Sequence, residues 1–130
     1  MKFMLLVYND KDLLGTLPAP EFDSRMRSCL SHADHLREEG RLFDSQMLED
    51  PGTAKSVRIR QGRKTVMDGP FAETKEVLGG FNLIEARDMD EAVRIAEGFP
   101  WVSTGCVEIR PVRDIEMVRE RVTSTADAAR

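Results

Sequence analysis

The first residues of the chain alternate apolar side chains on both faces of an extended segment. In the predicted strand 2–9, Phe3, Leu5 and Val7 lie on one face, and Met4, Leu6 and Tyr8 lie on the other. A strand that is apolar on both sides needs cover on both sides. The pattern therefore predicts a central strand of a sheet that has helices on one face and a second covering layer on the other.

Two segments have the three- and four-residue spacing of amphipathic helices. The first lies between Pro20 and Gly40, residues suited to a helix start and to the position after its end. Its apolar stripe is Phe22, Met26, Cys29, Leu30, Ala33 and Leu36. The second follows Asp88, which forms a capping-box pattern with Glu91. Its apolar face is Ala92, Val93, Ile95, Ala96 and Phe99, and Gly98 and Pro100 end it.

Turn signals divide the remaining chain into short strands at 41–48, 56–60, 64–67, 80–86 and 105–110. Strands 56–60 and 64–67 form a hairpin, with Val57 and Ile59 facing inward and Arg58 and Arg60 facing solvent. The resulting order is strand, helix, strand, hairpin, strand, helix, strand. This order predicts an α+β fold of the ferredoxin-like, split β-α-β type, with an inserted hairpin and both helices on one face of the sheet.

Two segments lie outside this framework. Residues 10–20 contain Gly15, Pro18 and Pro20, and we interpret them as a loop that forms a wall or lid of a site. Residues 1–113 form the predicted domain, and residues 114–130 a charged tail that contains at most a short helix. We expect this tail to be dispensable for folding, unless it embraces a partner subunit.

Length and charge narrow the function. The 130 residues suffice for one domain, and a net charge of −4 with basic residues spread along the chain argues against nucleic acid or membrane partners. A small molecule is the expected ligand. Neither a signal peptide nor a transmembrane segment is predicted. Cys29 and Cys106 form no Cys-x-x-Cys pair, which suits reduced thiols, so we expect a soluble, cytoplasmic protein.

The segment 66–81 concentrates residue types that packing alone does not explain. Asp68 closes a strand and enters a Gly-Pro turn, and Phe71 supplies an apolar anchor that can pin the turn to a core. A carboxylate held at a pocket edge, partly removed from water, is suited to proton transfer. The alternative is that Asp68 only hydrogen-bonds its own turn. Gly79 and Gly80 permit a close approach of backbones.

The same residues carry a family resemblance. DGPFAETKE followed by LGGF, within residues 68–81, resembles the DGPF group of the YCII-related domain proteins. The opening residues 1–8 and the segment 107–112 are similar to that family too, so the resemblance covers the chain up to Asp114. It implies a dimeric α+β barrel, an enzymatic role, and an association with alternative sigma factors of the extracytoplasmic-function type.

The resemblance also implies a histidine on the first helix that pairs with the family's aspartate. Counting back from Gly40, this position is Cys29 here, and His32 lies one turn later. Because this chain has a cysteine where the family has a histidine, the sequence does not establish a His-Asp dyad. A thiol within an apolar stripe is typical of a small core residue. His32 and His35 lack an evident third ligand, so no metal site is predicted, and no nucleotide-binding motif indicates a cofactor.

Three further side chains complete the candidate site. Tyr8 and Glu108 lie on strand faces that can line a barrel interior, and Trp101 is either a packing residue or an aromatic wall for a ligand. We predict a homodimer, because the second apolar face of strand 2–9 needs a cover. Our first interpretation is a small-molecule enzyme that uses Asp68 for proton transfer, with Tyr8, Cys29, His32, Phe71 and Glu108 as ligand-binding residues. The alternative is a non-catalytic ligand-binding or regulatory module.

Overall fold

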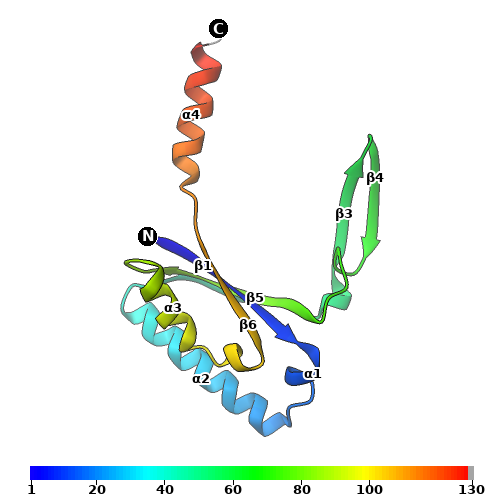
Figure 1. Ribbon diagram of the computed structural model, residues 1–130, viewed down its shortest axis with the longest axis vertical. Coiled ribbons are helices and arrows are strands. Elements are labelled where there is room, and N and C mark those ends of the chain that lie inside the picture. Colours follow the sequence, from blue (N-terminus) through cyan, green and yellow to red (C-terminus); the bar gives the residue numbers. More distant parts are fainter. Residues whose placement is uncertain (129–130) are drawn as a thin grey trace.

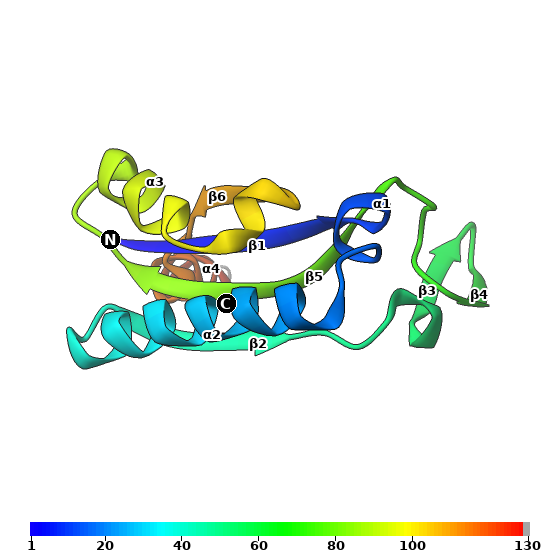
Figure 2. The same cartoon turned by 90° about the horizontal axis from the view of Figure 1, so that it is seen from below.

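A computed structural model describes residues 1–128 of the chain and shows a four-stranded antiparallel sheet of order β2-β5-β1-β6. Its strands are β1 (Lys2–Asp10), β2 (Leu42–Met47), β5 (Glu76–Glu85) and β6 (Gly105–Pro111). Helices α2 (Ala19–Glu38) and α3 (Met89–Glu97) cover one face of the sheet (Figure 2). The α+β, ferredoxin-like prediction is therefore confirmed, including the placement of both helices on one side.

The core lies between this sheet and the two helices. Phe3, Leu5, Ile84 and Phe99 are fully buried there. Phe3 pairs with Ile84 across β1 and β5, so their side chains leave the sheet on the same face. The residues predicted to lie on one apolar face of β1, Phe3, Leu5 and Val7, are thus buried against the helices. On the other face, Met4, Leu6 and Tyr8 are half-buried. The C-terminal helix α4 (Ile115–Ala128) stands on this side but extends away from the sheet (Figure 1), so no helix of the described residues packs along this open face.

Helix α3 begins with the predicted Asp88 cap, but the return bond expected from the Asp88 amide to Glu91 comes instead from the Arg87 amide. The Glu91 amide donates to the Asp88 carboxylate at 2.9 Å, and the Arg87 amide donates to the Glu91 carboxylate at 3.0 Å. The first of these bonds holds the pKa of Asp88 below its ordinary value. The second does the same for the pKa of Glu91. Local sequence therefore fixes the start of this helix.

The glycine pair of the 66–81 segment lies inside β5, which begins four residues before the predicted strand. A β-bulge opposite Val7 and Tyr8 accommodates Gly79. A Cβ on Gly80 would lie 2.6 Å from the Gln46 backbone oxygen. The close backbone approach expected of this pair is confirmed, here between β5 and β2.

The hairpin of β3 (Lys55–Arg60) and β4 (Arg63–Asp68) forms a separate two-stranded sheet. It projects away from the main sheet (Figure 1). Val57 and Ile59 are 67% and 62% exposed. The prediction that they face inward is wrong for the single chain, because the hairpin does not lie over the sheet and no element of residues 1–128 covers that side.

The segment between β1 and α2 is not all loop, because α1 (Lys11–Leu14) forms one turn of helix there. Short 3₁₀ turns follow β2 and α3, as η1 (Pro51–Thr53) and η2 (Pro100–Ser103). The C-terminal helix α4 (Ile115–Ala128) is longer than predicted and extends away from the sheet (Figure 1). Residues 129 and 130 of the predicted tail lie outside the described residues. No helix within residues 1–128 has the length and apolar character needed to cross a membrane.

Candidate functional site

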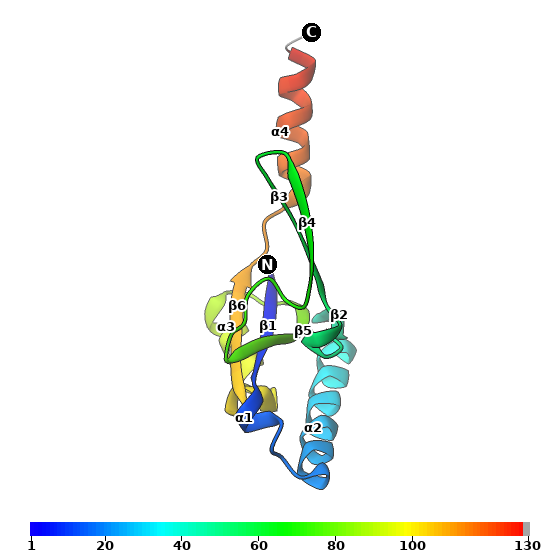
Figure 3. The ribbon, with the colours of Figure 1, turned by 90° about the vertical axis from the view of Figure 1, so that its right-hand side faces the viewer.

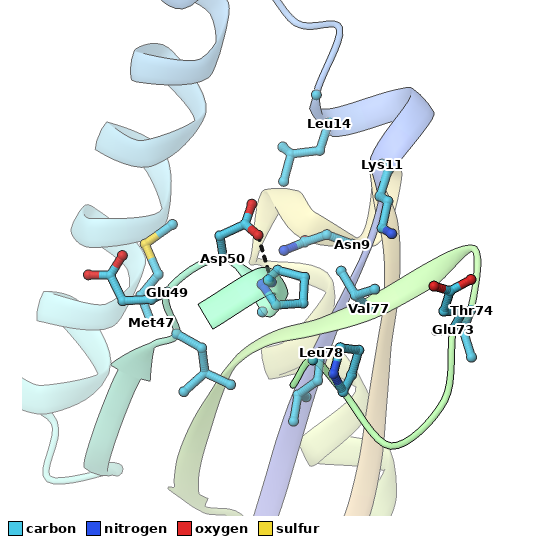
Figure 4. Close-up of a pocket in the computed structure, with 17 residues that line it drawn as sticks. Asn9, Lys11, Leu14, Met47, Glu49, Asp50, Glu73, Thr74, Val77 and Leu78 are labelled. Atoms are coloured by element: carbon cyan, nitrogen blue, oxygen red, sulfur yellow. Dashed lines mark hydrogen bonds between the residues drawn. The ribbon is translucent and has the colours of Figure 1, made fainter. Parts of the chain in front are cut away.

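A cleft of about 770 Å³ opens at the end of the sheet where β1 stops. The C-terminal end of β1, the first turn after it, the end of β2 and the start of β5 form its walls. Figure 4 shows an apolar part formed by Leu14, Met47, Val77 and Leu78, and a polar part formed by Asn9, Lys11, Glu49, Asp50, Glu73 and Thr74. The mixed lining suits a small organic molecule with polar substituents.

Short-range hydrogen bonds set the shape of these walls. The buried Asp10 carboxylate accepts from the Asp12 amide at 2.9 Å and so starts α1. Asp50 does the same for η1 by accepting from the Gly52 amide at 2.8 Å. Asp10 also lies 3.7 Å from the Lys75 ammonium. This ion pair ties the 66–81 segment to the end of β1.

A second, inner pocket of about 190 Å³ lies between α2 and the sheet. Asn9, Leu14, Met47 and Gly79 line both cavities, so the inner pocket and the outer cleft adjoin at these residues. Cavities on the order of 150 Å³ admit a benzene ring. The two together therefore provide a ring-sized chamber with a wider, polar entrance.

The inner pocket is mostly apolar, with a small number of polar groups. The Asn9 Oδ1 is buried and accepts no hydrogen bond from any described residue. Asn82, which is buried, accepts from the Ser45 hydroxyl at 2.6 Å. Figure 4 shows the Asn9 side chain extending into the outer cleft, so it lies at the junction of the two cavities.

Cys29 and Trp101 form the deep wall of the inner pocket. The Trp101 indole N–H donates to the Cys29 sulfur at 3.3 Å. Burial raises the pKa of the Cys29 thiol, and the bond from Trp101 opposes this only in part. The thiol therefore stays protonated at neutral pH and acts as a hydrogen-bonding wall rather than as a nucleophile. The interpretation of Cys29 as part of the apolar stripe holds, and Trp101 both packs and lines the pocket.

Asp68 lies beside the outer cleft rather than in it. Gly69 and Pro70, the next two residues, belong to the lining. The Asp68 side chain is 87% exposed and forms an ion pair with Lys55 at 2.5 Å, across the hairpin. Within one chain the expected partial removal of this carboxylate from water does not occur. Phe71 is 80% exposed, so the expectation that it pins the turn to a core is also wrong for one chain.

Hydrogen bonds to Ala54 and Ser56, and not packing of Phe71, hold the turn after Asp68. The Gly69 amide donates to the Ala54 carbonyl at 2.7 Å, and the Ser56 hydroxyl donates to the Gly69 carbonyl at 2.9 Å. Gly69 has a φ of +90°, a left-handed conformation that favours glycine. The turn after Asp68 is thus fixed relative to the hairpin.

His32 is remote from this site. Its ring lies edge-on to Phe99, with centroids 4.6 Å apart, and its Nε2 is 2.9 Å from the Ile95 carbonyl oxygen. These contacts join α2 to α3, so His32 does not take the place of Cys29. His32 and His35 border a shallow groove between these helices. No group of three or more metal-ligating side chains occurs among the described residues.

Tyr8 and Glu108 lie on the open face of the sheet. Tyr8 pairs with Leu78 and Cys106, and Glu108 pairs with Leu6. The structure does not bring them together with Asp68 or Cys29 in one cavity. The sequence analysis missed Asn9 as a site residue, because a polar residue after an apolar strand reads as a strand end. The signal was its position at the end of a central strand, where sheet folds place ligands.

The fold and the cavities define a ferredoxin-like α+β domain with a cleft at one end of its sheet. The family model of the YCII-related domain matches residues 1–116, and the chain belongs to this family. A protein of Rhizobium meliloti (strain 1021), named uncharacterized protein R00369, is 36% identical over 114 residues, which cover 86% of this chain and 92% of the relative.

One solved structure with this fold is 5-chloro-2-hydroxyhydroquinone dehydrochlorinase (TftG) from Burkholderia phenoliruptrix AC1100, in complex with 2,5-dihydroxybenzoquinone. The likeness has a TM-score of 0.51 and 15% sequence identity, and it covers 87% of this chain and 94% of that one. At this identity the comparison shows the shared fold and nothing about the substrate of this chain.

Proposed function

We propose that this protein binds and transforms a small planar molecule that carries hydroxyl or carbonyl groups. The observation that supports it most is a ring-sized, mostly apolar pocket that adjoins a wider cleft at Asn9, whose side-chain amide extends into that cleft (Figure 4). In this proposal the ring enters the inner pocket against Trp101, and a hydroxyl or carbonyl oxygen of the ligand accepts a hydrogen bond from the Asn9 side-chain amide, whose nitrogen points into the cleft (Figure 4). The ring compound named with TftG, a protein of the same fold, supports this choice of ligand class.

We assign proton transfer to Asp68. It directly precedes the cleft residues Gly69 and Pro70, and its turn is fixed by hydrogen bonds to Ala54 and Ser56. A ligand seated in the inner pocket extends its polar substituents toward this rim. Asp68 forms its ion pair with Lys55 across the hairpin, and a carboxylate is a suitable group to accept a proton from a ligand. The cleft lining itself contains three carboxylates: Asp50 caps η1, and Glu49 and Glu73 lie on separate walls (Figure 4).

The functional unit in this proposal is a homodimer. The open face of the sheet presents Met4, Leu6, Tyr8, Phe81 and Leu83, all half-buried, with no cover from residues 1–128. A contiguous exposed apolar patch on the order of several hundred Å² is unusual on a monomer. A second sheet placed over the first buries both patches at once.

A non-catalytic ligand-binding or regulatory module is the second candidate function. It is favoured by Cys29, a protonated thiol at the position where the family resemblance implies a histidine. The same cavities would then hold a ligand without turnover.

One experiment separates the two. The protein is mixed with a panel of hydroxylated quinones and hydroquinones, and the absorption spectra are followed over time, with the Asp68→Asn variant in parallel. The enzyme proposal expects spectral conversion by the wild type and a large loss of rate in the variant. Binding without conversion by the wild type supports the regulatory module, and no binding across the panel contradicts both.

A further inference from the structure

Two projections stand on the uncovered side of the molecule, the hairpin β3–β4 and the helix α4. Figure 1 shows them well separated, and Figure 3 shows both extending away from α2 on the same side. Their lengths match. Six residues of strand span about 20 Å, and 14 residues of helix span about 21 Å.

Each projection carries an apolar stripe that nothing covers within residues 1–128. On the hairpin, Val57 pairs directly with Val66, and Ile59 lies two residues further along the same face. On α4, Ile115, Val118 and Val122 have the spacing of one helix face. All of these except the half-buried Val118 are exposed. Apolar stripes on both projections indicate that each one docks.

The charge of the hairpin indicates what it docks against. Residues 55–68 contain five of the 19 basic residues and one of the 23 acidic residues, which leaves 14 basic and 22 acidic residues elsewhere. The basic residues are therefore less evenly spread than the sequence analysis assumed. A basic arm on an acidic chain is complementary to a second copy of the same chain.

We propose that the two arms clamp a second copy of this chain, with the α4 stripe of each protomer packed along the Val57, Ile59 and Val66 face of its partner's hairpin. A two-fold axis across the open face brings each arm of one protomer onto the other arm of the partner. This inference rests on the homodimer proposed above and adds its contacts.

The clamp has a consequence for Asp68. Lys55 and Asp68 pair on the same hairpin face as Val57 and Val66. The α4 helix of the partner therefore covers the Lys55–Asp68 ion pair and removes it from bulk water. The proton-transfer residue of one protomer is thus completed by the other, and the single chain leaves it exposed for that reason.

Cysteine cross-linking tests the clamp in the full-length chain. In a background of Cys29→Ala and Cys106→Ser, one population carries Val57→Cys and a second carries Val118→Cys. The two are mixed, allowed to exchange subunits and oxidised mildly. We expect disulfide-linked dimers in the mixture and not in either population alone. Matched controls carry Arg58→Cys, on the other hairpin face, and Met117→Cys, on the far side of α4, and their mixture stays unlinked.

Sedimentation equilibrium on the same samples separates the failure of this inference from the failure of the homodimer. A monomer overturns both. A dimer without the Val57–Val118 link overturns the clamp alone, as does a link within the Val118→Cys population, which indicates helix-to-helix pairing. If circular dichroism shows that Val118→Cys is unfolded, Val122→Cys on the same stripe takes its place. Removal of residues 113–130 should leave a folded chain whose dimer dissociates at higher protein concentration than the wild type.

Discussion

The indole N–H of Trp101 donates a hydrogen bond to the sulfur of Cys29 over 3.3 Å, joining the turn after α3 to the middle of α2. The two residues are 72 positions apart in the chain. Their contact closes the deep end of a ring-sized pocket between α2 and the sheet. Because the thiol is both partly buried and held by an indole, its ionisation reports directly on the state of this pocket.

The first prediction concerns the ionisation of Cys29. The pKa of its thiol is raised mainly by burial, and the Trp101 hydrogen bond lowers it in part. Trp101→Phe removes the donor, so the pKa should rise further and the thiolate fraction at alkaline pH should fall. Ultraviolet absorbance of the thiolate measures this in a Cys106→Ser background. An unchanged or lower pKa in Trp101→Phe would contradict the contact.

The second prediction concerns Asp68. In the single chain the Asp68–Lys55 pair is exposed, and exposed ion pairs contribute about 1 kcal/mol or less to stability, so Asp68→Asn should leave the unfolding free energy of the dissociated protomer nearly unchanged while turnover falls sharply. Urea denaturation and the quinone assay supply the two readouts. Lys55→Gln is the matched control, since it breaks the same ion pair but keeps the carboxylate, and it should retain more activity. An Asp68→Asn variant with full activity would leave Asp68 as a surface residue.

The third prediction concerns pH and the start of α3. The pKa of Asp88 lies below 3.8, chiefly because the Glu91 amide donates to its carboxylate. A carboxylate whose pKa is lower in the folded state than in the unfolded state stabilises the fold at pH values above its unfolded pKa. This contribution is lost as the pH falls through the folded pKa. Asp88→Asn should therefore flatten the decline of stability in acid. Asp90→Asn, which keeps the cap bond, should not, and equal pH profiles for the two variants would count against the cap.

The fourth prediction separates the two glycines of β5. A Cβ on Gly80 meets the Gln46 backbone, and forced overpacking costs about 1–3 kcal/mol, so Gly80→Ala should lower stability. A Cβ on Gly79 instead meets the Asn9 side chain, which can move. Gly79→Ala should therefore weaken ligand binding more than stability. Denaturation and calorimetry on both variants measure this, and the reverse order of effects would argue against the placement of Asn9.

The sequence predicts the fold well because its signals are local. The alternation around Leu5 sets the helix-facing side of β1, and the Asp88 cap sets the start of α3. The hairpin shows where this reasoning stops. The alternation around Val57 and Ile59 predicts an apolar face that needs cover, but the local sequence does not indicate which part of the molecule covers it. In the single chain the two remain exposed, and the clamp proposed above assigns their cover to a second copy.

The site is predicted less completely, because it forms from segments that meet only in the fold. Asp68 and Phe71 carry a strong local motif, yet they lie at the rim. Asn9 has no motif, and its importance comes from the register that places Gly79 against it. His32 shows the converse, since a residue type associated with chemistry serves here to join two helices.

The central claim is that a ring-sized ligand occupies the inner pocket with a hydrogen bond to Asn9. Isothermal titration calorimetry with 2,5-dihydroxybenzoquinone and related hydroxylated rings tests it most directly, on the wild type, Asn9→Leu and the control Glu49→Gln. Loss of a buried hydrogen bond costs about 1–3 kcal/mol, so affinity should fall by about fivefold to a hundredfold in Asn9→Leu and stay near wild type in Glu49→Gln. Equal affinity in Asn9→Leu and the wild type, or no binding by any ring compound, would contradict the account.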